Sequence, residues 1–303
     1  MTSPGTTHTH KTEQFSLSLF LFTVAVSIVV LGAGLRYIAP AAWDLQWHKP
    51  VWAFLVAFTS ISLLNCFVEY FFHRYVLHRP AILGLGRMYR QHTLHHALTR
   101  IVRKPAHNGR NFLSVENKFP IIEPEQGEGS FFPWFSLGVF ALILTPVFAL
   151  LQWLTPEIPW FLGGIAALTC SIILYELLHA INHWPFESWA PLIDHKKWGW
   201  FWRPVYSFHL RHHAVIDCNE SISGFFGLPI ADWVFHTCVI PPTIYADGEE
   251  WKSENFTAPR PALLIRWLDD CAEKAIRSRR AKFRAKARPR VASRVAMDSK
   301  QGR

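Results

Sequence analysis

Four stretches of the chain are apolar for long enough to cross a membrane as helices. Residues 15–35 carry no charged side chain, and a helix of about 20 residues spans the roughly 30 Å hydrocarbon core of a bilayer. Residues 51–72 form a second stretch, and residues 131–154 and 158–182 form a third and a fourth. The pattern predicts an all-α integral membrane protein with about four transmembrane helices.

The first stretch admits a second interpretation, a cleaved signal peptide. The apolar core of a signal peptide is only about 7–15 residues long and precedes a small-residue cleavage site. The longer uninterrupted run of residues 15–35 favours an anchored helix instead.

Composition supports the membrane class. Half of the residues are hydrophobic, 15% are aromatic and 17% are charged, whereas a soluble domain carries about 25% charged residues. An entirely water-soluble protein and a disordered chain both fit this composition poorly. The five cysteines are odd in number and form no CxxC pair, which argues against a disulfide framework or a structural zinc finger.

Basic residues indicate the orientation of the spans. The connections at residues 36–50 and 155–157 contain only Arg36 and Lys49, and the other 29 of the 31 Lys and Arg residues lie on the opposite face. The positive-inside rule makes that face cytoplasmic.

The organisation expected from these patterns has four parts. They are an N-terminal tail at residues 1–14, a membrane and catalytic domain at 15–213, a membrane-surface extension at 214–261 and a tail at 262–303. The tail begins apolar and becomes strongly basic, so we expect it to lie on anionic lipid or to be disordered rather than to bind nucleic acid.

Histidine is the most unusual feature of the composition. Ten of the 16 histidines fall into four tight clusters near the cytoplasmic ends of predicted spans. Their spacings along the chain are HX4H, HX2HH, HX3H and HX2HH. In order, the clusters are His73 and His78; His92, His95 and His96; His179 and His183; and His209, His212 and His213.

Helical spacing directs the rings of each cluster to one side. Residues three and four apart share a helix face, which suits the second, third and fourth clusters. His73 and His78 are five apart, which separates them by about 140° on an unbroken α-helix. Because Pro80 disfavours helix at the residue before it, we expect His78 to lie where the second span frays, with both rings converging from different directions.

Ten imidazoles near a bilayer need partners. Each buried ring without one costs on the order of 1 kcal/mol or more, and a metal ion supplies a partner to several rings at once. Ten ligands are too many for one ion and suit two ions with five nitrogens each. Imidazole binds iron, copper, zinc and nickel, so the ligand type alone does not name the metal.

The surroundings narrow the chemistry. Zinc has no redox activity, and hydrolytic two-metal sites usually rely on bridging carboxylates, which are scarce here. Glu69 and Glu176 precede a histidine by one helical turn, and we interpret them as groups that orient a ligating ring through its second nitrogen rather than as ligands. His107 and His236 are further candidates for that role. Neutral ligands in an apolar setting favour iron-based dioxygen activation over hydrolysis.

In the order and spacing of its clusters, residues 73–213 of the chain resemble the fatty acid hydroxylase/sterol desaturase superfamily of membrane two-metal enzymes. The resemblance implies four membrane helices under a cytosolic helical cap that holds two iron ions, with zinc as a substitute in a purified protein. It implies metal-ligand roles for all ten clustered histidines. Two external electrons would come from a redox partner such as ferredoxin or cytochrome b5 with its reductase.

The resemblance weakens beyond the last cluster. Relatives carry an Asn-aromatic-Gly sequence and later a Trp-Asp pair, whereas here Asn219 leads to Gly224 and the pair reads Asp232-Trp233. The substrate therefore cannot be carried over. Residues 221–229 are expected either to line an acyl tunnel or to re-enter the membrane surface.

The expected function is a membrane-bound monooxygenase that hydroxylates, or desaturates, a lipid such as a fatty acyl chain or a sterol. Its active site would face the cytoplasm from the cytoplasmic membrane of a bacterium or the endoplasmic reticulum of a eukaryote. Carotenoid hydroxylase is an alternative, favoured by residues 183–186. A non-enzymatic metal transporter or sensor is another, which would place its ligands near the bilayer midplane.

Overall fold

Four helices in the structure are long and apolar enough to cross a membrane. The structure is a computed structural model that describes residues 16–106, 108–109, 111–117, 132, 135–184, 186–241, 245–246 and 257–301. The four candidate spans are confirmed close to their predicted bounds, and the second continues into a π-helical turn, η1. They are α1 (Leu17–Ile38), α3 (Val51–Phe72) with η1 (His73–Leu77), α6 (Ser136–Leu154) and α7 (Trp160–Asn182).

The spanning helices form one tightly packed bundle. Helix α3 lies along α7, α6 packs on α7, and α1 contacts α6 and the short helix α2 (Pro40–Asp44). A Cβ atom added at Gly163 would lie 2.5 Å from the Cβ of Ala57, and one added at Gly164 would lie 2.7 Å from the ring of Phe148. Glycine at these positions lets the helices approach closely, as small residues do in membrane bundles.

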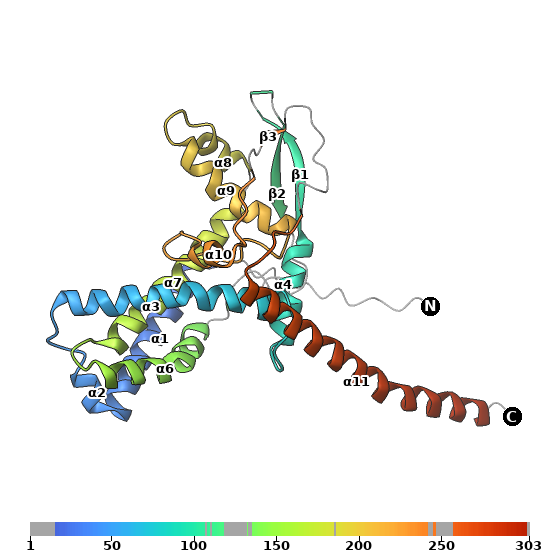
Figure 1. Cartoon of the computed structure of the whole chain (residues 1–303), viewed down its shortest axis with the longest axis horizontal. Helices are drawn as coiled ribbons and strands as arrows, with labels where there is room; N and C mark the ends of the chain where they lie inside the picture. The colour runs from blue at the N-terminus through green and yellow to red at the C-terminus, as the bar shows by residue number, and fades with distance from the viewer. Residues whose placement is uncertain are drawn as a thin grey trace, which may run out of the picture.

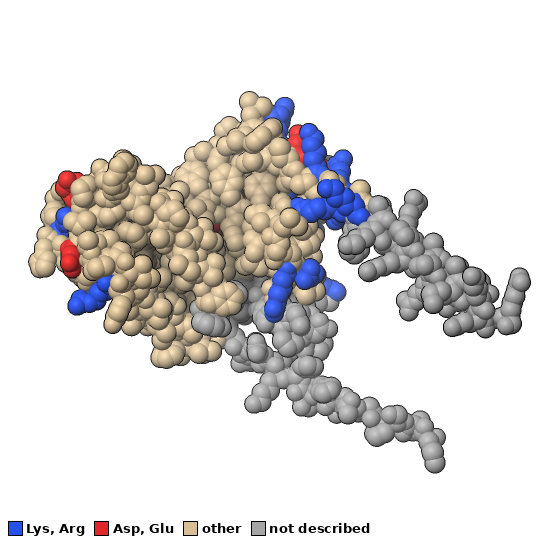
Figure 2. All heavy atoms as spheres, turned by 90° about the horizontal axis from the view of Figure 1, so that it is seen from below, with Lys and Arg blue, Asp and Glu red and all other residues tan. Residues whose placement is uncertain are grey.

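The outside of the bundle is apolar as well. Phe22, Val29 and Leu142 are 65%, 69% and 68% exposed, and Figure 2 shows an uncharged surface between charged residues gathered at the two ends. Exposed apolar surface on this scale is normally covered by a partner or by lipid. The chain therefore has the form of a membrane protein.

Shorter elements gather at the end of the bundle where α3 and α7 finish (Figure 1). We call them the end block. It includes a three-stranded antiparallel sheet in the order β1-β2-β3, so the expectation of a purely helical protein is wrong in this region. The elements are α4 (Gly86–Leu98), β1 (Thr99–Pro105), β2 (Asn111–Asn117), α8 (Phe186–Ile193), α9 (Gly199–Ala214), α10 (Ile230–Phe235) and β3 (Tyr245–Ala246).

The sheet belongs to the core of the end block. The ring of Phe112 stacks on that of Phe186 with centroids 3.4 Å apart, and the Tyr206 hydroxyl donates to the carbonyl oxygen of Leu113 at 2.9 Å. β1 and β2 pair with each other as an antiparallel hairpin. Their apolar positions are too few to resemble a span, so a search for long apolar runs does not detect them.

The C-terminal segment also differs from the expectation. Residues 263–301 form one helix, α11 (Leu263–Gln301), where we expected an amphipathic segment followed by disorder. Its first turns are anchored, with Ile265 fully buried beside Tyr70 and Phe235. The rest of α11 runs away from the body of the molecule (Figure 1).

Candidate metal centre

All ten clustered histidines come together where the bundle meets the end block. The ends of α3 and α7 supply four of them, α4 supplies three and α9 supplies three. Three groups among the described residues place their ring nitrogens within 4.8 Å of one another and could each hold a metal ion. The groups are His73, His78, His92, His96 and His212; His95, His183 and His213; and His179, His183 and His209.

The first group, called here the five-histidine group, converges through its Nε2 atoms. The Nε2 atom of His73 lies 3.0 Å from that of His92 and 3.2 Å from that of His78. The Nε2 atom of His78 lies 3.1 Å from that of His212, and the Nε2 atoms of His96 and His92 are 3.1 Å apart. Five rings from three parts of the chain, the α3 end with η1, α4 and α9, thus point to one small volume.

The other two groups share His183, so their five members form a second centre. The Nε2 atom of His179 lies 3.2 Å from that of His95, and the Nε2 atom of His209 lies 2.9 Å from that of His183 and 3.1 Å from that of His213. The two centres touch where the rings of His96 and His213 stack, with centroids 4.3 Å apart.

The convergence of His73 and His78 has a different cause from the fraying that we expected. Residues 73–77 form a π-helical turn, in which the His78 N–H donates to the His73 carbonyl oxygen at 3.0 Å. An i→i+5 hydrogen bond closes one wider turn, so residues five apart lie one above the other. The π-turn therefore aligns two rings that an α-helix would separate. Such turns are rare in proteins as a whole, and many of those that occur lie at functional sites.

Two backbone carbonyls fix the tautomers of two rings in the five-histidine group. His73 Nδ1 lies 2.6 Å from the carbonyl oxygen of Glu220, and His212 Nδ1 lies 2.9 Å from that of Cys218. A carbonyl only accepts, so both Nδ1 atoms carry the proton and both Nε2 atoms present a lone pair. Both lone pairs belong to ring nitrogens that converge within the five-histidine group, where a metal ion could accept them. The donor set therefore fits a metal ion.

Burial also favours the neutral form of these rings, because it lowers their pKa. It lowers the pKa of His78, His92 and His96 well below the ordinary value, and the neighbouring rings lower it further. The pKa of His212 falls to about 4, mainly because of burial. These rings are neutral at physiological pH, which is the form that binds metals. The pKa is also well below its ordinary value, mainly because of burial, at His95, His183, His209 and His213.

The expectation that Glu69 and Glu176 orient ligating rings is wrong. Glu69 accepts hydrogen bonds from the backbone N–H groups of Ser223 and Gly224, at 2.7 and 3.0 Å. Glu176 accepts one from the N–H of Phe132 at 2.6 Å. Both carboxylates hold chain segments in place, and neither belongs to a histidine group found among the described residues.

His107 and His236 are the two further candidates for orienting a ligating ring, and His236 does not do so. It is exposed at the end of α10, and His107 lies outside the described residues. Carbonyls of the loop at residues 217–220 orient His73 and His212 instead. A carbonyl has no sequence signature, which explains why sequence reasoning missed these positions.

Asn219 and Asp232, noted in the sequence, hold that loop. The Asp232 carboxylate accepts from the N–H groups of Glu220 and Ser221 at 3.0 and 2.9 Å. The Asn219 amide donates to the carbonyl of Val239 and accepts from its N–H, at 2.8 and 2.7 Å. The two side chains contribute to the candidate metal centre indirectly, by fixing the carbonyls that face the rings.

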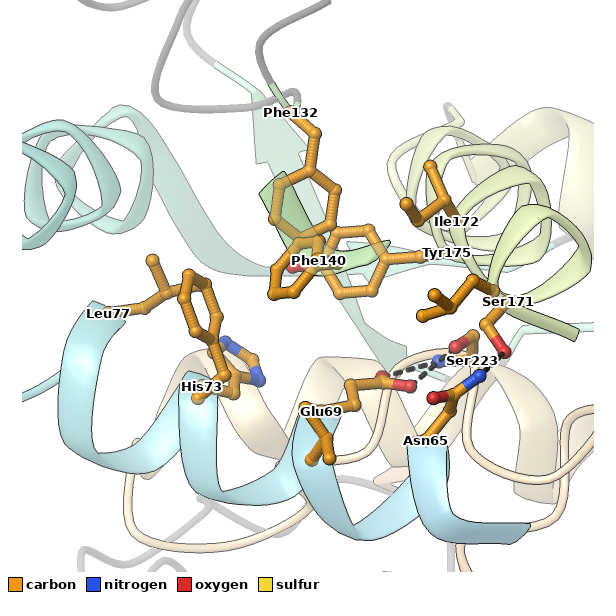
Figure 3. Close-up of a pocket in the computed structure, with 13 residues that line it drawn as sticks. Asn65, Glu69, His73, Leu77, Phe132, Phe140, Ser171, Ile172, Tyr175 and Ser223 are labelled. Atoms are coloured by element: carbon orange, nitrogen blue, oxygen red, sulfur yellow. Dashed lines mark hydrogen bonds between the residues drawn. The ribbon is translucent and has the colours of Figure 1, made fainter. Parts of the chain in front are cut away.

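An apolar pocket reaches the five-histidine group from inside the bundle. It contains about 500 Å³ of space between atoms, counting its open mouth, and lies among α3, α6 and α7. Figure 3 shows Asn65, Glu69 and His73 in a row along α3, facing Phe132 and Tyr175. Ser223, from the stretch 221–229, contributes to the lining. One candidate ligand, His73, thus forms part of the pocket wall.

Comparisons of the chain with known protein families, with curated proteins and with solved structures return no match.

Proposed function

We propose that the protein is a membrane-bound di-iron oxygenase that hydroxylates a lipid, with desaturation as the close variant. The observation that supports this most is the contact between a histidine centre and an apolar pocket at His73. The family resemblance of the four clusters points to the same activity.

The ten histidines would hold two ions, five nitrogens to each. The five-histidine group would hold one, and His95, His179, His183, His209 and His213 would hold the other. Bound iron would supply dioxygen activation, which zinc, without redox chemistry, does not. In the overall reaction the substrate C–H bond becomes C–OH and the second oxygen atom leaves as water, which consumes two electrons and two protons from outside.

The chain itself would position the substrate. Most of the accessible surface of the pocket between α3 and α7 is apolar, so it suits the hydrocarbon part of a fatty acyl chain or a sterol. An alkyl chain entering between the spans would come into contact with the wall at His73. Holding the reacting bond near the centre in this way lowers the entropic part of the barrier.

By the positive-inside rule, the distribution of Lys and Arg favours a site on the cytoplasmic side. There a soluble or membrane-attached electron donor, such as ferredoxin or cytochrome b5 with its reductase, would have access. The histidine centres lie at one end of the spanning helices, at the ends of α3 and α7, rather than at their middle. This placement favours an enzyme over a transporter, which needs ligands near the midplane.

Lipid mass spectrometry of an expression host tests the proposal. Cells that produce the protein together with a donor system should contain a lipid heavier by one oxygen atom, or lighter by two hydrogen atoms. His92→Ala should remove the product, whereas His195→Asn, at an exposed turn outside the groups, should retain it. An unchanged lipidome with iron-loaded protein and donor present would contradict the proposal.

A further inference from the structure

Both histidines of the first cluster are followed directly by an arginine, and the two arginines meet at one carboxylate. Arg74 follows His73 and Arg79 follows His78. Asp269 of α11 accepts from Arg74 Nε at 3.0 Å and from Arg74 Nη2 at 2.6 Å, and it also accepts from Arg79 Nη1. Asp269, near the start of the C-terminal helix, therefore binds one arginine at the start of the π-turn and another just beyond its end.

The contact continues from Arg74 to the loop that orients the rings. Arg74 is 1% exposed, and its Nη1 donates to Glu220 Oε1 at 2.9 Å and to the Asp217 carbonyl at 3.2 Å. The Glu220 carbonyl in turn accepts from His73 Nδ1. Three hydrogen bonds thus connect Asp269 to a candidate metal ligand.

Arg79 makes a parallel connection. Its Nη2 donates to Asp217 Oδ1 at 2.7 Å, and Asp217 precedes Cys218, whose carbonyl accepts from His212 Nδ1. Asp269 therefore acts on two members of the five-histidine group through two arginines. The Tyr75 hydroxyl, which donates to Asp269 Oδ1 at 2.9 Å, adds a third contact from the π-turn.

Two arginines face three carboxyl groups in this cluster, those of Asp217, Glu220 and Asp269. The pKa of the Asp269 carboxyl lies below its ordinary value: burial alone would raise it, but the hydrogen bond from Arg74 and the charges of Arg74 and Arg79 lower it more. An ionised Asp269 gives the buried Arg74 a two-point partner, the strongest geometry for such a pair. Without it, Arg74 would keep Glu220 but lose the partner of two N–H groups, and a buried charge with an incomplete shell is costly.

We propose that Asp269 is a positioning residue for the metal centre, which fixes the π-turn and the 217–220 loop through Arg74 and Arg79 so that the five-histidine group is preorganised for an ion. The proposal rests on the proposed function only in requiring that this group binds metal. It assigns α11 a role that its distance along the chain from the histidine clusters does not suggest.

Titration of the metal-free, full-length protein with Co²⁺ tests the proposal, because the visible absorption of bound Co²⁺ reports both affinity and ligand geometry. Asp269→Asn should bind Co²⁺ about ten- to a hundredfold more weakly, the range for groups that orient ligands from outside the coordination shell, and with shifted bands. Asp269→Glu should recover part of the affinity. Asp270→Asn, the same change at the next, exposed position of α11, should match the wild type.

Arg79→Gln provides a second variant that breaks only one of the two connections, at a side chain 18% exposed. It should show an intermediate loss of Co²⁺ affinity even if Asp269→Asn does not fold. Wild-type affinity and bands in Asp269→Asn, with only a lower thermal midpoint of the metal-free protein, would reduce Asp269 to a structural role and overturn the inference. Absence of Co²⁺ and Fe²⁺ binding by the wild type would instead overturn the proposed function.

Discussion

Two buried polar networks lie at opposite ends of α7, roughly 33 Å apart for a helix of 23 residues, and they are satisfied in different ways. At the start of α7, Gln46 Nε2 donates to Gln152 Oε1 at 3.0 Å, while Gln152 Oε1 and Gln46 Oε1 accept from the N–H groups of Trp160 and Phe161, each at 3.1 Å. Donors meet acceptors throughout this network, which caps a helix and needs nothing more.

The histidine centres at the other end of α7 are built differently. There the Nε2 atoms approach one another, and the Nδ1–H bonds of His73 and His212 make the Nε2 atoms of these two rings acceptors. Ring nitrogens that converge with their lone pairs free are the arrangement that a metal ion binds. The comparison teaches that the glutamine network is complete in itself, whereas the histidine groups present ring nitrogens that could hold a metal ion.

Removing one ring from the five-histidine group should have the largest effect. His212→Ala is expected to release one of two ions and abolish oxygenase activity, because the remaining nitrogens no longer enclose the site. Metal analysis of the purified protein measures the number of metal ions per chain. Unchanged metal content in this variant would contradict the assignment of His212 as a ligand.

Lowering the pH should have the next largest effect, and the loss of stability should come from the histidine end rather than from the glutamine end. The pKa of His212 is about 4 in the fold and about 6.5 in an unfolded chain. Between these values the unfolded state binds more protons, so stability falls as pH drops below about 6.5, by about 1.4 kcal/mol per pH unit for each such ring. Thermal midpoints of metal-free protein from pH 8 to pH 5 measure this, and a constant midpoint would refute it.

Filling the pocket should lower activity while leaving the ions in place. Ser171 lines the pocket, and Ser171→Phe puts a ring where the substrate chain would lie, so turnover should fall on the order of a hundredfold. The matched variant Ser171→Ala removes the hydroxyl without filling space and should retain most of the turnover. Full activity in Ser171→Phe would exclude this pocket as the substrate site.

The smallest effect is expected at the glutamine end. Gln152→Ala leaves Gln46 Nε2 and the Trp160 N–H without the acceptor that they share, at a cost of about 1–3 kcal/mol for a buried group. The thermal midpoint should fall, and metal content and turnover should stay at wild-type values. A loss of metal in this variant would show that the two ends are coupled, contrary to the comparison.

The sequence determined what depends on local pattern. Apolar runs gave the four candidate spans, because crossing a bilayer requires about 20 apolar residues in a row. Helical spacing placed the rings of the three α-helical clusters on common faces, since residues three and four apart always share a face. The ten histidines that the structure gathers into groups are those that the sequence clusters singled out.

Tertiary structure decided what depends on segments far apart in the chain. Phe186 and Tyr206 hold strand β2 against the helices of the end block, which no local period indicates. Carbonyls of residues 218 and 220 orient two rings, and a backbone atom leaves no trace in residue identity. The sequence contains two His-Arg pairs, His73-Arg74 and His78-Arg79. Their common partner, Asp269, becomes evident only in the folded chain, where α11 packs against the π-turn. An ion pair between residues so far apart in the chain depends on tertiary geometry.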